Sequence, residues 1–219
     1  MTADHISWAF LPEEMNGSPL FFISHIIGRL TMPIMCFFAA EGYYRTRSVK
    51  RYLLRMIVFT VISHFAYCFE NGRSFIPDGI LLQTSVMLPL TMGLLALTAA
   101  KSSLPQWTKI IAVLGCCAVS LTGDWAVFPV IAVLGFGLFR DNFRNQCIVL
   151  AADAVLTCAA DWYLLNGNTA SLITAGAVLA LPLIKLYNGR RSGSKFGKWF
   201  FYIYYPAHLI IIGIIKIII

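Results

Sequence analysis

Apolar residues in this chain form long stretches, and polar residues gather in the short gaps between them. A helix needs about 20 apolar residues, with a range of about 17–25, to cross the hydrocarbon core of a membrane. Inside lipid only helices and closed barrels satisfy their own backbone, and stretches of these lengths favour helices. The pattern therefore predicts an all-α, polytopic transmembrane helical bundle of about nine helices. The predicted segments cover about residues 1–11, 20–44, 52–69, 80–100, 110–121, 127–139, 146–161, 170–187 and 199–217.

Several segments are shorter than a full membrane span. The first, residues 1–11, is too short to cross, and it lacks the basic start and cleavage site of a signal peptide. Because the chain must change sides before Glu13, we expect the first helix to be truncated in this sequence. The Gly-Asp-Trp sequence at 123–125 fits a tight outer turn between two short helices, which we expect to be tilted or shielded by neighbours. A single integral membrane domain over residues 1–219, without a separate soluble domain, is predicted.

The basic residues fall in alternate gaps. Fourteen of the 17 lysines and arginines lie in every second gap, and the remaining three are Arg29, Arg73 and Lys216. Since short basic loops stay in the cytoplasm, this bias predicts cytoplasmic basic loops and a C-terminus outside. The fourteen residues are Arg45, Arg47, Lys50, Arg51, Arg55, Lys101, Lys109, Arg140, Arg144, Lys185, Arg190, Arg191, Lys195 and Lys198.

The composition agrees with a membrane protein. Charged residues make up only 12% of the chain and the mean hydropathy is +0.74, whereas soluble domains carry about 25% charged residues. A net charge of +7 is also found in nucleic-acid-binding proteins, but here the charge sits in membrane-flanking loops rather than on one solvated face. We therefore expect contact with anionic membrane lipids and no nucleic acid partner.

Metal and phosphate motifs are missing from the sequence. The six cysteines show neither CxxC spacing nor an extracellular pairing pattern, which favours buried thiols over a zinc site or disulfides. The histidines are too scattered for a metal site, and no metal is expected. The glycines of residues 189–193 lack the strand–loop–helix setting of a phosphate-binding loop.

Ionisable residues within the apolar segments are the first candidates for chemistry, because a central Arg, Lys or Asp costs about 2.5–3.5 kcal/mol on insertion scales. At about 1.5 Å per residue, His5, Arg29 and His64 come about 9, 13 and 8 Å below the outer boundary. His208 falls near mid-helix, beside Tyr205. We expect these groups to meet in one cavity in the middle-to-outer half of the bundle.

Two readings stay open for several of these residues. Asp4 and His5 are sequence neighbours and point about 100° apart on a helix, so Asp4 is expected to orient another group, with Arg29 the obvious partner. Arg29 also fits a purely structural ion pair with Asp4 or Glu41. Likewise, His25 and His64 fit interfacial or satisfied core histidines as well as a functional site.

The chain resembles the TraX family of bacterial membrane proteins, named for a pilin acetylase of conjugative plasmids. The matching pieces run in order over nearly the whole chain. They are DHI at residues 4–6, FLPEE at 10–14, GRLTMPIMCFFAAEG at 28–42, TRSVKRYLLR at 46–55, ISHFAY at 62–67, GDW at 123–125 and FYIYYPAHL at 201–209.

The resemblance implies a multi-pass acetyltransferase of the bacterial inner membrane, distantly similar to the acyltransferase-3 group, which takes acetyl-CoA from the cytosol. Carried onto this chain, it makes His5 the catalytic base, Asp4 its motif companion and Arg29 a binder of phosphate, carboxylate or oxyanion. The acceptor would be a pilin or other peptide N-terminus, or a surface glycan. The implied substrate-binding residues are Tyr205, His208, Glu41 and His64. The implied cofactor-binding residues are Arg45, Arg47, Arg51 and Arg55, whose alternative reading is simple topology charge.

The expected reaction is direct transfer, in which His5 accepts a proton from an amine or hydroxyl that attacks the acetyl thioester. The main rivals are a non-enzymatic transporter or flippase and an assembly partner of a pilus or export complex. Transporters often show repeated halves, and no internal repeat is visible here.

Overall fold

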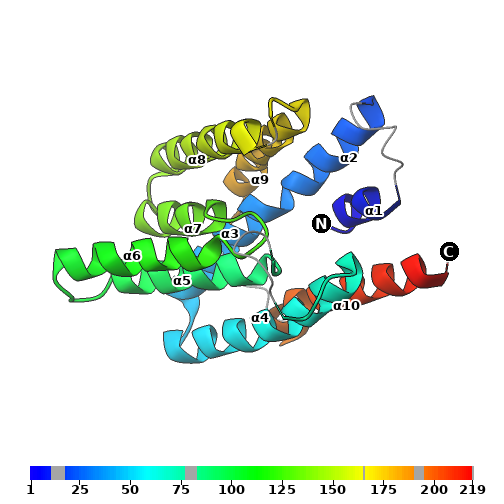
Figure 1. The fold of residues 1–219 in the computed structure, drawn as a ribbon. Coiled ribbons are helices and arrows are strands. Elements are labelled where there is room, and N and C mark those ends of the chain that lie inside the picture. The colour runs from blue at the N-terminus through cyan, green and yellow to red at the C-terminus, as the bar shows by residue number, and fades with distance from the viewer. Residues whose placement is uncertain (11–17, 77–82, 165, 190–194, 219) are drawn as a thin grey trace.

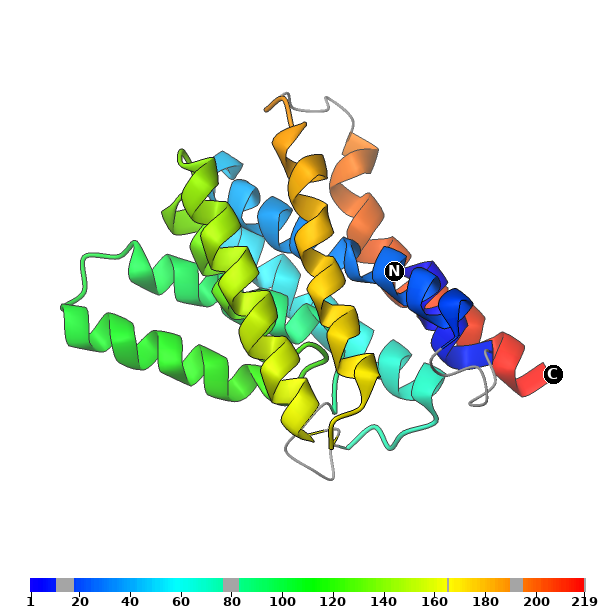
Figure 2. The same cartoon turned by 90° about the horizontal axis from the view of Figure 1, so that it is seen from above.

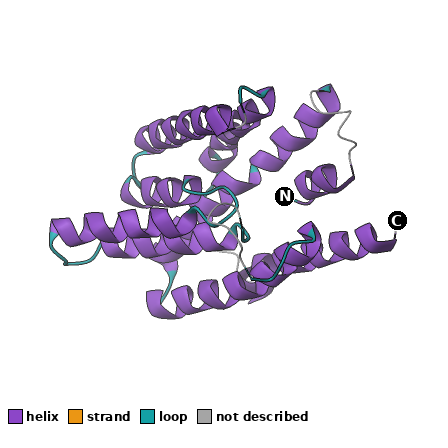
Figure 3. Cartoon of the chain, viewed as in Figure 1, coloured by secondary structure: helices purple, strands orange, loops and turns teal. Residues whose placement is uncertain are grey.

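The computed structural model describes residues 1–10, 18–76, 83–164, 166–189 and 195–218, with only the backbone described at 169–170 and 195–198. Within these ranges the chain is helical and contains no strand beyond one isolated bridge, so the predicted all-α class is confirmed (Figures 1 and 3). Glu13, Arg190 and Arg191 lie outside the described residues. The elements are α1 (Thr2–Phe10), α2 (Pro19–Arg29), α3 (Thr31–Arg45), α4 (Val49–Asn71), α5 (Met87–Ala100), α6 (Gln106–Ser120), α7 (Phe128–Leu138), α8 (Phe143–Leu164), η2 (Thr169–Ala180), α9 (Leu181–Lys185) and α10 (Lys195–Ile218).

Each of the nine predicted segments corresponds to one helix or to two helices in series. The pairs in series are α2 with α3 and η2 with α9. Four helical stretches are long and apolar enough to cross a membrane: Pro19–Arg45, Val49–Asn71, Phe143–Leu164 and Trp199–Ile218. The protein is therefore a helical membrane protein. The predicted segment 146–161 was too short, because α8 continues into flanking polar residues and reaches 22 residues.

Local sequence signals set several helix ends. Ser18 caps α2 by accepting a hydrogen bond from the Phe21 amide at 3.2 Å, and Pro19 follows at the first helical position. Ser48 caps α4 in the same way through the Arg51 amide. Gly72, with φ of 62°, ends α4 in the left-handed conformation that glycine adopts most easily.

The short helices α5 and α7 form the centre of the bundle. They pack against each other, α5 also packs against α4 and α6, and α3 packs on α7 (Figures 1 and 2). Leu94 and Leu97 of α5 and Val133 of α7 are fully buried. By contrast α6 exposes Trp107 and Leu114 on the outside of the bundle, as a lipid-facing helix does. Of the two short helices that flank the Gly-Asp-Trp turn, α7 is thus shielded by its neighbours as expected, whereas α6 is not.

The connections rich in basic residues lie at one end of the bundle, which we name the basic end. Contacts between segments far apart in sequence bring them together: Arg140 Nε donates to Glu41 Oε1 at 2.7 Å, and Arg45 Nη1 donates to the Gly189 carbonyl at 2.9 Å. The described basic residues there are Arg45, Arg47, Lys50, Arg51, Arg140, Arg144 and Lys185. The opposite end, named the far end, holds the connections that follow α4, α6 and α8 (Figure 2).

Candidate functional site

The Asp4 carboxylate joins α1 to α2. His25 Nδ1 donates to Asp4 Oδ1 at 2.6 Å, and Arg29 Nη1 donates to Asp4 Oδ2 at 3.1 Å. His25 and Arg29 are four residues apart on α2 and so lie on one face. The predicted contact between Asp4 and Arg29 is present, and His25 is a second partner that the sequence reading left among the core histidines.

Gly28 allows α1 to approach α2 this closely. It is buried, and a Cβ atom at this position would overlap the Asp4 side chain. The His25 ring is fully buried between Trp8 and Phe21, whose ring centroids lie 4.5 and 4.3 Å away. The packing therefore fixes the ring that orients Asp4.

The loop between α6 and α7 places Trp125 on the Arg29 guanidinium. The Arg29 Cζ lies 4.7 Å from the centroid of the indole, within cation–π range. Trp125 adopts φ of 68°, a left-handed conformation that costs a bulky residue on the order of 1–3 kcal/mol. Neighbouring backbone bonds hold the loop, since Asp124 N donates to the Thr84 carbonyl at 2.8 Å. The predicted tight turn is confirmed, and burial raises the pKa of the Asp124 carboxyl above its ordinary value.

His5 faces a second carboxylate, on α4. Its Nδ1 lies 3.9 Å from Glu70 Oε2, which is an ion-pair distance rather than a hydrogen bond. Glu70 is buried, and its Oε2 also accepts a hydrogen bond from Asn71 Nδ2 at 2.6 Å. The Lys216 Nζ lies 4.0 Å from Glu70 Oε1. The sequence reading missed Glu70 because it ended the apolar segment at Phe69.

His208 lies on the other side of His5. The two ring centroids are 5.3 Å apart, and the rings meet edge to face. His208 Nδ1 donates to the Tyr204 carbonyl at 2.9 Å, so its buried Nε2 is an acceptor, and within the described residues that atom has no hydrogen-bond partner. The fully buried Tyr205 packs against His208 with centroids 5.5 Å apart. We refer to His5, Glu70 and His208 as the histidine cluster.

Of the seven predicted catalytic and substrate-binding residues, five therefore come together where α1 meets α2 and α10, and two do not. Glu41 lies at the basic end, bound to Arg45 and Arg140. Both ring nitrogens of His64 are occupied, by Thr84 Oγ1 at 2.9 Å and the Phe75 carbonyl at 2.8 Å, so His64 holds a far-end loop. The expectation that His64 shares the cavity with His5 is not met. The five residues are Asp4, His5, Arg29, Tyr205 and His208.

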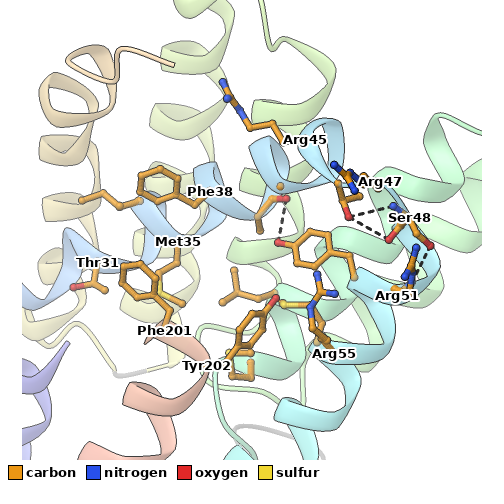
Figure 4. Close-up of a pocket in the computed structure, with 18 residues that line it drawn as sticks. Thr31, Met35, Phe38, Arg45, Arg47, Ser48, Arg51, Arg55, Phe201 and Tyr202 are labelled. Atoms are coloured by element: carbon orange, nitrogen blue, oxygen red, sulfur yellow. Dashed lines mark hydrogen bonds between the residues drawn. The ribbon is translucent and has the colours of Figure 1, made fainter. Parts of the chain in front are cut away.

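A cavity of about 600 Å³, named the main cavity, extends from the basic end to Thr31 and Phe201 (Figure 4). The four arginines predicted to bind the cofactor, Arg45, Arg47, Arg51 and Arg55, all line it. At its other end Thr31 and Phe201 line it. Along α3, the fourteen residue steps from Thr31 to Arg45 correspond to about 21 Å at 1.5 Å per residue. Its walls between the two ends are mostly apolar, with Ile34, Met35, Met56, Met87 and Leu90.

The four arginines differ in their surroundings. Arg47 and Arg51 are exposed, and Arg55 lies deeper, over the Tyr52 ring. Arg45 donates through Nε to Glu41 and through Nη1 to Gly189, and its guanidinium turns away from the other three (Figure 4). Arg47, Arg51 and Arg55 are therefore directed to the main cavity. Arg45 lies between this cavity and the neighbouring part of the basic end.

The first turn of α1 meets the deep end of the main cavity. The Met1 amino group donates to Thr31 Oγ1 at 2.8 Å, and the Thr2 hydroxyl is hydrogen-bonded to the Tyr204 hydroxyl. Tyr204 stacks on His208 with ring centroids 5.3 Å apart. The lining of this cavity includes Thr31 and Phe201 but no residue of α1 and no member of the histidine cluster.

Sequence comparison assigns the chain to a family. The family profile described as "TraX protein" matches residues 1–216. The chain belongs to the TraX family. A curated relative of this TraX chain is a protein of Dichelobacter nodosus named "Probable fimbrial assembly protein FimC, serogroup H1". It is 30% identical over 217 residues, which cover 95% of this chain and 88% of the relative. No solved structure matches the chain.

The polar groups of this TraX chain suit proton transfer and anion binding better than metal binding. Among the described residues, no group of three or more His, Cys, Asp or Glu side chains is placed to hold a metal ion. All six cysteines are free thiols. The arrangement offers an imidazole beside a carboxylate, a mostly buried arginine and a cavity with cationic groups at one end.

Proposed function

We propose that this TraX-family chain is a membrane acetyltransferase that moves the acetyl group of acetyl-CoA to an amine or hydroxyl acceptor. One observation carries the proposal: a single cavity runs from the exposed arginines to Thr31, whose hydroxyl accepts a hydrogen bond from the Met1 amino group, four residues before His5. Acetyl-CoA has the same polarity, with phosphates at one end and the acetyl thioester at the other. The middle section of acetyl-CoA matches the mostly apolar walls of the cavity. The cavity volume of about 600 Å³ lies within the usual range for ligand pockets.

Arg47, Arg51 and Arg55 bind the phosphate groups in this account. Guanidinium groups form strong, paired hydrogen bonds to phosphate and stay charged at any physiological pH. The pantetheine arm then follows the apolar wall of α3 towards Thr31. Movement of the Tyr204 ring and the first turn of α1 admits the thioester to the histidine cluster.

His5 acts as the general base. Its Nδ1 faces Glu70, so the carboxylate favours the tautomer with the proton on Nδ1 and leaves the Nε2 lone pair free. Nε2 takes the proton of the acceptor N–H or O–H, and the nucleophile attacks the thioester carbonyl carbon. The C–S bond then breaks, and the thiolate of CoA takes the proton back from the imidazolium. A positioned base of this kind contributes typically ~10²–10⁴-fold in rate.

Arg29 stabilises the negative oxygen of the tetrahedral intermediate. Asp4 and Trp125 fix its guanidinium, and within the described residues its buried Nε has no hydrogen-bond partner. A fixed, unused donor is what an oxyanion site requires, and one such donor is worth about 10²–10³-fold. Asp4 thereby acts through Arg29 and His25 rather than through His5.

The location follows from the charge pattern. The basic end faces the cytoplasm of a bacterial inner membrane, where acetyl-CoA is made, and the C-terminus lies on the outer side. The named function of the relative favours an acceptor in fimbrial or pilus assembly, either a pilin-like peptide or a surface glycan. The histidine cluster lies in the far-end half of α10, on the side from which such an acceptor would approach.

The test is transfer of labelled acetyl groups from acetyl-CoA in membranes that contain the protein. His5→Ala is expected to lower the rate at least about 100-fold, whereas Ile6→Ala, its exposed neighbour on the same helix, is expected to retain it. Equal transfer by His5→Ala and the parent chain would rule out His5 as the base. Accumulation of a substrate in vesicles without acetyl transfer would instead favour the transporter reading.

A further inference from the structure

A second cavity of about 470 Å³ lies at the basic end, on the other side of Arg45. The ends of α3 and α9, the loop after α7 and the start of α8 line it, and it is open on one side. Arg45 lines both cavities, so the two adjoin at this side chain. Its guanidinium bonds to Glu41 and Gly189, which belong to the second cavity and not to the main one.

The second cavity carries fixed cationic groups. Arg140 donates to Glu41 Oε1 through Nε at 2.7 Å and to Oε2 through Nη2 at 3.3 Å, while Arg45 Nε donates to Oε2 at 2.7 Å. These bonds use only part of the five N–H groups of each guanidinium, and the rest are available for another acceptor. Lys185 adds a third cation, against the carboxylates of Glu41 and Asp141, so the lining has one excess positive charge.

Flat aromatic surfaces accompany these cations. Arg45 lies over the Tyr187 ring with its Cζ 5.6 Å from the centroid, and the Lys185 Nζ lies 5.9 Å from the centroid of Phe143. Both rings line the cavity, so a planar base has surfaces on which to stack. The buried Gln146 also lines it, and its Nε2 donates to the carbonyls of Phe139 and Arg140, which leaves its Oε1 as an acceptor for an amino group.

We propose that the second cavity binds the 3′-phosphoadenosine end of CoA, while the pantetheine arm passes Arg45 into the main cavity. This rests on the proposed function and adds a nucleotide subsite to it. Arg140 and Lys185 bind the 3′-phosphate, Tyr187 or Phe143 stacks on the adenine, and Gln146 accepts its amino group. Arg47 and Arg51 at the main cavity then bind the pyrophosphate, so the charges of the ligand are divided between the two cavities.

The first experiment measures binding of radiolabelled adenosine 3′,5′-bisphosphate to the purified protein in detergent, which needs no acetyl transfer. Arg140→Gln and Lys185→Gln are expected to weaken binding about tenfold or more, the usual scale for a hydrogen bond to a charged group. Lys185→Gln leaves the bonds of Glu41 intact, so a fold defect cannot explain its effect. Arg144→Gln removes a charge from the same end without lining either cavity and should bind normally.

The second experiment compares acetyl-CoA with acetyl-pantetheine, which lacks the nucleotide, as donors. Lys185→Gln should raise KM for acetyl-CoA about tenfold and leave KM for acetyl-pantetheine unchanged. Absence of bisphosphate binding, or equal weakening in Arg144→Gln, overturns the subsite. Specific bisphosphate binding combined with no transfer from either donor sustains the subsite and refutes the acetyltransferase instead.

Discussion

Glu70 Oε2 lies 3.9 Å from His5 Nδ1, although the two residues belong to helices separated by two others in the chain. The carboxylate is buried and is shared with Asn71 and Lys216. This pairing supplies the partner that a histidine base requires and that its sequence neighbour Asp4 does not provide. It also connects the far-end parts of α4 and α10 to α1.

Replacing Glu70 with Gln should lower kcat about 10–100-fold, part of the ~10²–10⁴-fold that a positioned base contributes. The amide keeps the shape of the side chain but no longer favours the His5 tautomer with a free Nε2. KM for acetyl-CoA should stay unchanged, because Glu70 lies outside the main cavity. Steady-state kinetics of labelled acetyl transfer measure both constants. Ile6→Ala, the exposed neighbour of His5, is the control; an equal loss of kcat in that variant would contradict the assignment.

Asp4 and Arg29 should show energetic coupling. Asp4→Asn leaves a mostly buried arginine without its counter-ion, and removal of one partner of a buried ion pair costs about 3–5 kcal/mol. The double variant Asp4→Asn, Arg29→Gln should be less destabilised than the sum of the single variants, with a coupling energy of about 0.5–3 kcal/mol. Thermal unfolding of the four proteins in detergent gives this value. Strict additivity would mean that the two side chains do not interact.

Gly28→Ala should destabilise the protein by about 1–3 kcal/mol, as expected for overpacking of a close contact. The new methyl group overlaps the Asp4 side chain and pushes α1 away from α2. Gly115→Ala on α6 is the matched control, because a Cβ atom there meets nothing within 4 Å. That variant should be neutral or stabilised by about 0.5–1 kcal/mol. Unfolding temperatures of the two variants test the helix contact without any assumption about function.

Arg51→Gln and Arg55→Gln should each raise KM for acetyl-CoA about tenfold, because each removes one charge-assisted hydrogen bond. The rate at saturating donor should change little, since neither residue lies near His5. Lys109→Gln removes a basic residue that lines neither cavity and should behave like the parent chain. If all three variants have the same KM, the arginines do not bind the donor and only set the orientation of the protein in the membrane.

The sequence predicted the nine helical segments because a membrane demands long apolar stretches, and lipid leaves few alternatives to a helix. It also predicted the contact between Asp4 and Arg29 from the scarcity of charges in those stretches. The contact between His25 and Asp4 could also have been predicted, because His25 lies four residues before Arg29 and therefore on the same helix face. Glu70 was missed because the predicted segment ended at Phe69, two residues before the end of α4.

Other contacts were beyond a single sequence. Glu41 and Arg140 are 99 positions apart, and no local pattern links them. His64 seemed equivalent to His5 in depth, but depth along a helix does not say which face a side chain occupies. The placement of Trp125 on Arg29 depends on the left-handed backbone of a loop, which requires the packed structure around it.

The most direct test of the account asks whether the sulfur of CoA reaches the deep end of the main cavity. Thr31→Cys places a thiol there, and treatment with a CoA disulfide reagent followed by mass spectrometry detects a CoA adduct at that position. The account predicts an adduct that excess acetyl-CoA prevents and that Arg51→Gln weakens, while Thr98→Cys, which lines neither cavity, gives none. No adduct at position 31, or equal labelling at position 98 regardless of acetyl-CoA, would contradict it.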